Sequence, residues 1–378
     1  MDIIIFVLVL SLLVIIHELG HFLMARRFGV KVEEFGVGYP PRAKILKTDK
    51  RGTLYSLNWL PIGGFVRLYG EEGVEAGETP LNTKEAFYLK PLRQRLPIIA
   101  AGVVVNFVFG VIIFAGLYTY LGISQGLPKD LGYVKVAEVS PGSPAERAGL
   151  KVGDQVVAVK TEQGSHVVTN SSQFIAKVSE NAGRQITLVL TNPAKETWVY
   201  VRNKAEIPPG QGSIGVVITD YEMFHYPLWQ MPFRGIGVGL KSAFELGWLI
   251  LTSLGMMVNK LLTQGQVPAD VAGPVGIAYL ATKEKLFTQG FVTLLNFMAM
   301  LSINLAIINI LPIPPLDGGR AAMLLYEGIT RKRVSAKLER NILTVGMLFF
   351  LILIVLISIK DVGQIVTDSG LIRKLFGQ

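Results

Sequence analysis

The sequence predicts an α-helical polytopic membrane protein with about four transmembrane helices, a small membrane-associated β-hairpin region and an inserted soluble α+β domain. Half of the 378 residues are hydrophobic and only 17% are charged, against roughly 25% in ordinary soluble domains. The mean hydropathy is +0.44. Apolar stretches long enough to cross a bilayer flank a polar middle section. The chain therefore divides into a membrane half (1–126), a soluble domain (127–221) and a second membrane half (222–378).

The net charge of +9 raises the question of a nucleic-acid partner. The basic residues lie mainly in loops beside apolar segments and do not form one patch interleaved with aromatic side chains. This distribution is typical of loops that orient membrane helices, so we expect a lipid bilayer as partner and no nucleic acid. The absence of cysteine excludes disulfides and thiolate ligands, so a metal site could use only His, Asp or Glu.

Ile3 to Met24 is the first apolar segment, and its length of about 22 residues is enough to cross a hydrocarbon core of roughly 30 Å. It makes a poor signal peptide, because no basic region precedes it and Arg26-Arg27 stands where a small-residue cleavage site would be expected. Basic residues after a membrane helix favour the cytoplasm. The end of this helix is therefore predicted to be cytoplasmic.

This first segment contains His17, Glu18 and His21. On a helix, residues four apart lie on one face, so the two imidazoles could bind one metal ion. Chance would produce the motif on the order of once in a thousand such sequences. Simple pairing with neighbouring helices is a weak explanation, because ionisable side chains in lipid are costly and usually mark function. A metal site explains spacing, residue types and location together, with Glu18 as a carboxylate able to deprotonate water.

Residues 30–70 change to short β-prone runs separated by Gly and Pro, which predicts a small sheet of hairpins next to the metal. An ordinary cytoplasmic loop domain would show the same pattern, and both interpretations stay open. An exposed strand edge could hold an extended peptide as an added strand.

Leu96 to Leu121 is the second predicted span, with arginines on its cytoplasmic side. Asn106 is its one strongly polar interior residue, with Gly102 and Gly110 on either side. This arrangement fits a close helix contact near the metal. A bond from Asn106 to any neighbouring helix would account for it equally well.

The soluble section contains the run VKVAEVSPGSPAERAGLKVGDQVVAV. It predicts a strand, a turn, a short helix Pro144 to Ala148 stopped by Gly149, a Gly-Asp turn and another strand. These 26 residues resemble a PDZ domain of the permuted type found in bacterial proteases. The resemblance implies a groove that takes peptide ends by strand addition, and we expect its wall at Ser213 to Thr219.

The C-terminal half has a clear span at Phe291 to Leu311 and a last span at Ile342 to Ile359. Ile236 to Leu262 is also apolar, but it carries Lys, Glu and Asn and could be a third span or an interfacial helix. The first span runs inward and the second outward, which leaves the PDZ-like domain extracytoplasmic. A crossing by 236–262 would then carry the end of 291–311 to the face opposite the histidines. An interfacial helix is therefore predicted.

Asp317 lies in the run NILPIPPLDGG, where prolines end a span and predict irregular backbone, which is tolerable at membrane depth only if it lines a site. A catalytic zinc site takes three protein ligands. With no cysteine available and the other two histidines outside the membrane segments, the third ligand must be a carboxylate. Asp317 is the only acidic residue at the end of a span on the Arg-rich side. The plainer alternative is a capping Asp before a Gly-Gly turn.

Taken together, these motifs resemble the site-2 protease family of intramembrane zinc metalloproteases, and specifically its bacterial RseP-like members. The resemblance covers nearly the whole chain. Its motifs are His17-Glu18-x-x-His21, Gly63-Gly64-Phe65, Gly102 to Asn106, the PDZ insert, Ala272-Gly273-Pro274 and Asn309 through Asp317-Gly318-Gly319. The chain departs from the best-known members in having room for a single PDZ domain.

The resemblance implies Zn2+ as cofactor, water activated on zinc held by His17, His21 and Asp317, and Glu18 as the base. It implies cleavage within or near transmembrane segments of single-pass membrane proteins, such as trimmed anti-sigma factors or remnant signal peptides. The expected location is the bacterial cytoplasmic (inner) membrane, in stress-response signalling.

Three further residues are expected to bind substrate. The resemblance alone suggests this role for Asn309. A substrate helix must unwind before cleavage, and the irregular backbone around Gly36 and Gly38 is where that could occur.

Two other functions fit parts of the sequence. An inactive adaptor could sequester clients through the PDZ domain, but it would not need Glu18 and Asp317 together with both histidines. A metal transporter should carry polar residues through several spans, and the sequence has one such cluster.

Overall fold

The computed structural model describes residues 2–71, 84–126, 132–191, 194–208, 211–219, 221–264 and 272–368. The chain divides into two compact units. The first combines Met1–Tyr120 with Trp229–Gln378, and the second is Leu121–Leu228. The second unit encloses the section 127–221 that the sequence sets apart as a soluble domain.

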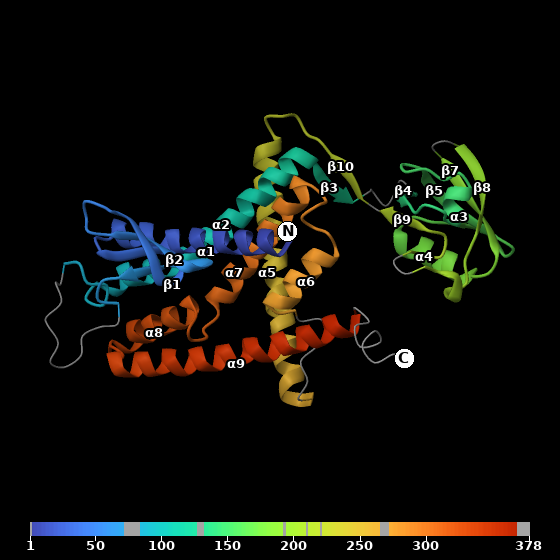
Figure 1. The fold of residues 1–378 in the computed structure, drawn as a ribbon. Coiled ribbons are helices and arrows are strands. Elements are labelled where there is room, and N and C mark those ends of the chain that lie inside the picture. The colour runs from blue at the N-terminus through green and yellow to red at the C-terminus, as the bar shows by residue number, and fades with distance from the viewer. Residues whose placement is uncertain are drawn as a thin grey trace. The chain divides into compact units, whose positions relative to one another are not determined.

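The described part of the first unit is mainly helical (Figure 1). Its helices are α1 (Asp2–Arg27), α2 (Leu92–Leu121), α5 (Met231–Gln264), α6 (Pro274–Lys283), α7 (Phe291–Ile310), α8 (Asp317–Thr330) and α9 (Ala336–Asp368). Among the described residues, five helices are long and apolar enough to cross a membrane, namely α1, α2, α5, α7 and α9. The prediction of about four spans is therefore not confirmed, because α5 meets the same criteria of length and composition.

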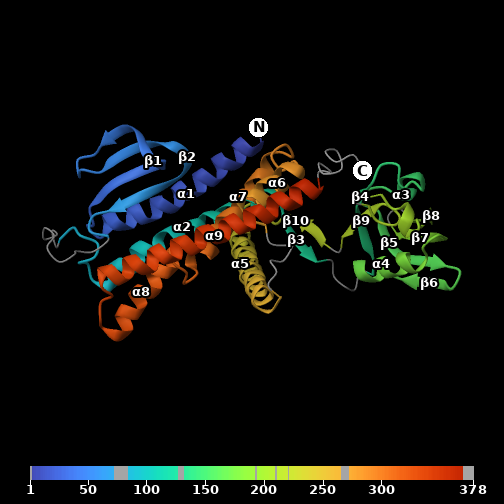
Figure 2. The ribbon, with the colours of Figure 1, turned by 60° about the horizontal axis from the view of Figure 1, so that its bottom comes forward.

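α5 differs from the other long helices in direction. In both views the axes of α1 and α9 are nearly aligned, while α5 lies crosswise to them (Figures 1 and 2). α5 packs on the end of α2 through glycine, since a Cβ at Gly239 would lie 2.8 Å from the backbone N of Ala115. Small residues such as glycine let two helix backbones come this close.

The predicted sheet near the first helix is formed by β1 (Val32–Thr48) and β2 (Leu54–Leu68), which pair antiparallel. Both strands bend, so that residues 32–37 pair with 64–68 on one side and, from residue 34, with 54–57 on the other. The sheet lies against α1 in both views (Figures 1 and 2). The aromatic rings of Phe22, Phe35 and Tyr55, in edge-to-face and tilted contacts, join it to α1.

α7 ends at Ile310, and the chain then makes an irregular turn through Pro314 and Pro315 before α8 begins at Asp317. The prediction that Asp317 itself lies in irregular backbone is wrong, because it is the first residue of α8. Proline lacks the amide hydrogen that a helix interior requires but is compatible with the residues just before a helix. The irregular backbone therefore ends one residue earlier than predicted.

The second unit has a sheet of strand order β8-β7-β5-β4-β9, with β6 on β5, and a short ladder between β3 and β10. The strands are β3 (Ile123–Gly126), β4 (Val134–Val139), β5 (Gln155–Thr161), β6 (Gly164–Val167), β7 (Gln185–Thr191), β8 (Ala194–Tyr200), β9 (Val216–Thr219) and β10 (Tyr221–Phe224). The helices are α3 (Pro144–Arg147) and α4 (Ser171–Glu180). α3 occupies the predicted short helix, capped by the Ser143 side chain and followed by Gly149 at φ 77°.

Candidate active site

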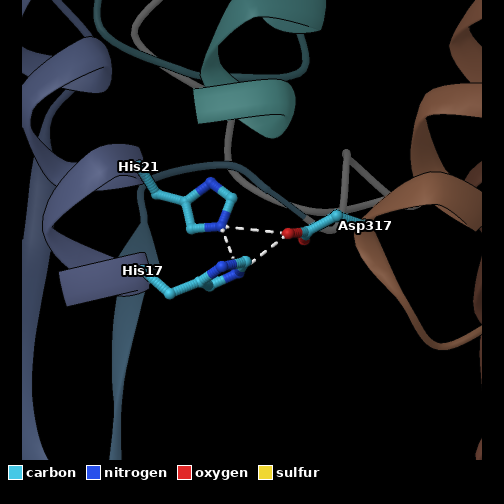
Figure 3. Close-up of side chains that lie close together, drawn as sticks. All are labelled: His17, His21 and Asp317. Carbon is cyan, nitrogen blue, oxygen red and sulfur yellow. Dashed lines mark hydrogen bonds and ion pairs between the residues drawn. The ribbon is translucent and has the colours of Figure 1, made fainter. Parts of the chain in front are cut away.

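α1 presents His17 and His21 on one face, one turn apart (Figure 3). Their Nε2 atoms lie 3.1 Å apart. Both imidazoles therefore point toward the same place, as their spacing on a helix predicts. Their side chains are only 9% and 12% exposed.

Asp317 reaches the same place from the first turn of α8 (Figure 3). Its Oδ2 lies 2.9 Å from His17 Nε2 and 3.2 Å from His21 Nε2. These residues are about 300 positions apart in the chain, so only the tertiary fold brings them together. Among the described residues, this is the group of three potential metal ligands whose donor atoms all lie within 4.8 Å of one another.

The two glycines after Asp317 allow α8 to start against the end of α7. A Cβ at Gly318 would lie 2.2 Å from the carbonyl oxygens of Ile310 and Leu311. A Cβ at Gly319 would lie 2.8 Å from the carbonyl carbon of Ile313. Any side chain at either position would push α8, and Asp317 with it, away from the histidines.

Glu18 lies beside the histidines on α1 and is half-buried. Its Cγ is 4.0 Å from where a Cβ at Gly64 would be, so the side chain lies next to Gly64 in β2. It is not one of the three clustered donors. Glu18 therefore stands next to the cluster, between it and the sheet.

The three residues expected to contact substrate lie in two other places. Gly36 and Gly38 are in β1, where a Cβ would lie 2.3 Å from the Phe65 ring or 2.4 Å from the Leu60 carbonyl oxygen. Both glycines are thus required for close packing inside the sheet. Asn309 is half-buried in the last turn of α7.

The donor set fits a divalent metal such as zinc. Asp317 Oδ2 is buried and has no hydrogen-bond partner of suitable geometry, although two ring nitrogens are close to it. Burial alone would raise the pKa of Asp317, but the two imidazoles beside it lower that pKa overall. The carboxylate is therefore held in its anionic form, which is the form that binds a metal.

α2 supplies partners for the histidines that the sequence only partly predicts. His21 Nδ1 lies 2.9 Å from the backbone oxygen of Ile98, and Asn106 Nδ2 lies 3.5 Å from His17 Nδ1. Asn106 and Gly102 could be singled out from the sequence, because a polar residue and a glycine stand out within an apolar span. The Ile98 oxygen could not, because a backbone carbonyl carries no sequence signature.

A pocket of about 600 Å³ opens beside the start of α8. Pro315 and Arg320 line it on one side and apolar residues of α9, such as Met347 and Leu351, on the other. Arg320 forms an ion pair with Glu71 at the pocket. Arg320 was not predicted, since a single arginine after Asp317 is not distinguishable from the other basic residues near membrane segments.

Two histidines one turn apart and a distant aspartate, held among apolar helices, form a group that could hold a metal ion, as in metallopeptidases. Comparison with known proteins agrees. A sequence model of the family described as Peptidase family M50 matches residues 5–353. The chain belongs to this family, the site-2 proteases, whose members are zinc-dependent peptidases. The family, the enzyme class and the zinc cofactor predicted from the sequence are thereby confirmed.

Several bacterial relatives match over nearly their whole length. A protein of Rickettsia conorii whose name describes a zinc metalloprotease is 32% identical over 95% of this chain and 98% of its own. A similarly named protein of Clostridium perfringens is 32% identical over 96% of this chain and 98% of its own. The regulator of sigma-W protease RasP of Bacillus subtilis is 27% identical over 95% and 98%.

Proposed function

We propose that this peptidase cleaves single-pass membrane proteins within or near their transmembrane segments. One observation carries the proposal: His17, His21 and Asp317 gather among apolar helices, and Glu18 lies beside them. A site among membrane-spanning helices would be accessible to the transmembrane segments of other proteins. A soluble substrate would have to enter an apolar surface to reach it.

In this proposal, His17, His21 and Asp317 hold zinc and Glu18 acts as general base and acid. The chemistry that zinc supplies is polarisation of the scissile carbonyl and a lower pKa for the attacking water. Glu18 takes one proton from that water as the oxygen attacks the carbonyl carbon. It then gives the proton to the amine nitrogen as the C–N bond breaks, so the free carboxylate is restored.

The edge of the sheet offers a way to hold the substrate. Among the described residues, segment 64–68 pairs only with 32–37, so its other edge is free for an added strand. Gly64 is next to Glu18, so a peptide on this edge would pass the base. Gly36 and Gly38 would act indirectly by shaping the sheet, while Asn309 would contact the peptide from α7.

The second unit is proposed to be the PDZ domain, on the extracytoplasmic face of the bacterial inner membrane. β9 has only β4 as a neighbour among the described strands, which leaves an edge for a peptide end. The name of the Bacillus subtilis relative concerns regulation of a sigma factor. We infer a similar substrate class here, anti-sigma factors already trimmed outside the membrane or remnant signal peptides, in stress signalling.

The test uses two variants of the full chain in detergent or liposomes. Glu18→Gln keeps the shape of the side chain but removes the base, so cleavage of a model single-pass substrate should fall by several orders of magnitude while zinc stays bound. Asp317→Ala should lose most of the zinc measured by elemental analysis, because two histidines alone make a weak site. Near-normal cleavage by Glu18→Gln would refute the mechanism, and unchanged zinc in Asp317→Ala would refute the ligand set.

A further inference from the structure

α2 passes the two histidines at the closest distance the backbone allows. A Cβ at Gly102 would lie 2.4 Å from His21 Nε2 and 2.7 Å from His17 Nε2. The helices touch again where a Cβ at Gly20 would lie 2.5 Å from the Ala101 oxygen. Groups on α2 are therefore the immediate neighbours of both imidazoles.

The outer nitrogen of His21 has a partner that fixes its tautomer. His21 Nδ1 is 2.9 Å from the backbone oxygen of Ile98. A carbonyl oxygen can only accept, so Nδ1 carries the proton, and in the neutral ring Nε2 then presents its lone pair. This is the tautomer that a metal ligand at Nε2 requires.

The outer nitrogen of His17 faces an amide instead. Asn106 is fully buried, its Nδ2 lies 3.5 Å from His17 Nδ1, and its Oδ1 is buried without a partner. With Nδ2 as donor, Nδ1 is the acceptor and the proton sits on Nε2, 2.9 Å from Asp317 Oδ2. Ligation of a metal at Nε2 would need the opposite tautomer, with the proton on Nδ1 and an acceptor next to it.

We propose that Asn106 is a positioning residue that serves both tautomers of His17. A half-turn of its carboxamide replaces the donor Nδ2 with the acceptor Oδ1, which would receive the Nδ1 proton when zinc binds. The inference rests on the proposed role of His17 as a ligand. It also explains why a polar residue lies at the centre of an apolar span, where a purely packing role would be met by leucine.

The backbone of Asn106 is anchored independently of its side chain. Ser302 of α7 donates from Oγ to the Asn106 carbonyl oxygen at 2.7 Å. This contact joins α2 to α7 at the level of His17 but does not reach the imidazole. Ser302 therefore offers a control for a general loosening of the helix contact.

The experiment measures zinc affinity of the full chain by competition with a chromogenic chelator, together with thermal unfolding of the zinc-free protein. Asn106→Leu keeps the volume but cannot accept a proton, so zinc affinity should fall about 10- to 100-fold. Asn106→Asp offers a permanent acceptor and should bind zinc at least as tightly as the natural chain. Ser302→Ala should leave zinc affinity within about threefold.

Two results would overturn the inference. One is wild-type zinc affinity in Asn106→Leu. The other is an equal loss in Asn106→Leu and Asn106→Asp, which would show a packing role, since only the leucine lacks the acceptor. A His17→Ala chain that kept wild-type zinc affinity would instead refute the proposed site itself, and the role of Asn106 with it.

Discussion

α2 and α9 are both long apolar helices, but α2 is largely packed against the rest of the protein and α9 is not. In the most apolar stretch of α2, 44% of the residues are buried, against 0% in that of α9 among the described residues. Apolar composition is therefore no guide to burial here, because lipid and protein interior are equally compatible with leucine and valine. The difference must come from the few residues in each helix that are not large and apolar.

The small and polar residues of α2 and α9 match this difference in burial. α2 carries Gly102 against the histidines, Asn106 beside His17, and Gly110 where a Cβ would lie 2.7 Å from Ile303. α9 has one comparable approach within its apolar stretch, at Gly346, where a Cβ would lie 2.4 Å from Pro314. Small and polar residues thus indicate which face of a membrane helix meets protein.

The largest effect is expected from Gly102→Ala in α2. The added methyl would lie within 2.7 Å of both imidazoles, and the α2 backbone cannot retreat without breaking its contact at Gly20. Zinc content by elemental analysis and cleavage of a membrane substrate should both fall at least about 100-fold, because ligands displaced by about 1 Å no longer converge.

Gly116→Ala on the same helix is the matched control. No atom lies within 4 Å of a Cβ at that position in the described structure, so zinc and activity should be unchanged. If Gly102→Ala behaved like Gly116→Ala, the close packing of α2 against the site would have no functional meaning.

The sequence could predict the part of the site that is local. The spacing of His17 and His21 determines their geometry on any helix, so only the helix had to be predicted. Asp317 required an argument by elimination and topology, which was possible because so few acidic residues lie at the ends of spans. The structure places it beside the two histidines, and its role as a ligand stays a prediction. The Ile98 carbonyl could not be predicted, since every residue offers one.

Helices α6 and α8 were also not predicted. α6 is a ten-residue helix and α8 begins with Asp317, Gly318 and Gly319, residues that disfavour helix interiors. α6 is stabilised by a tertiary contact, in which the backbone N–H groups of Gly273 and Gly276 donate to Asp361 at 3.0 and 2.8 Å. The first turn of α8 packs through Gly318 and Gly319 against the backbone after α7. Local sequence patterns do not record such contacts.

An intermediate effect is expected from Asp361→Ala, which tests the polar contact of the otherwise exposed α9. Asp361 is 2% exposed and accepts both N–H groups at the start of α6. Its removal would leave two buried donors unpaired, at a cost of about 2–4 kcal/mol. The thermal midpoint in detergent should fall, while zinc content should stay normal. Asp361→Asn retains an acceptor oxygen and should lose less; loss of zinc in either variant would contradict this separation of α9 from the site.

The relative chain directions of α1, α2 and α7 in the first unit help to decide whether α5 crosses the membrane. α7 runs parallel to α1, because the ring of Phe297 lies near that of Phe6 early in both helices and Asp317, after α7, meets His17 near the end of α1. α2 runs antiparallel to α1, since Ile98 contacts His21 and the later Asn106 contacts His17. The end of α2 and the start of α7 therefore lie on the same side of the membrane.

A chain that returns to the same side crosses an even number of times. α5 is the long apolar helix described between α2 and α7, and the ten residues of α6 would span only about 15 Å. A single crossing by α5 is thus inconsistent with the histidine–aspartate cluster, and its crosswise direction suits the membrane surface (Figure 2). We expect α5 to lie in the outer interface, where its exposed Lys241 and Glu245 can reach water.

Single cysteine substitutions, which should disturb the protein least, can test whether α5 crosses the membrane. Because the chain has no cysteine of its own, each engineered one can be labelled without background. Ser165→Cys in the second unit, Gln264→Cys at the end of α5 and Ser335→Cys before α9 should all retain activity. With a membrane-impermeant thiol reagent, the first two should label in intact cells and the third only after permeabilisation, because the basic run Arg331 to Arg333 predicts a cytoplasmic loop. Protection of Gln264→Cys with labelling of Ser165→Cys would show that α5 crosses. In that case another crossing would have to exist between α5 and α7, or the directions of α1 and α7 would differ from those that place Asp317 beside His17.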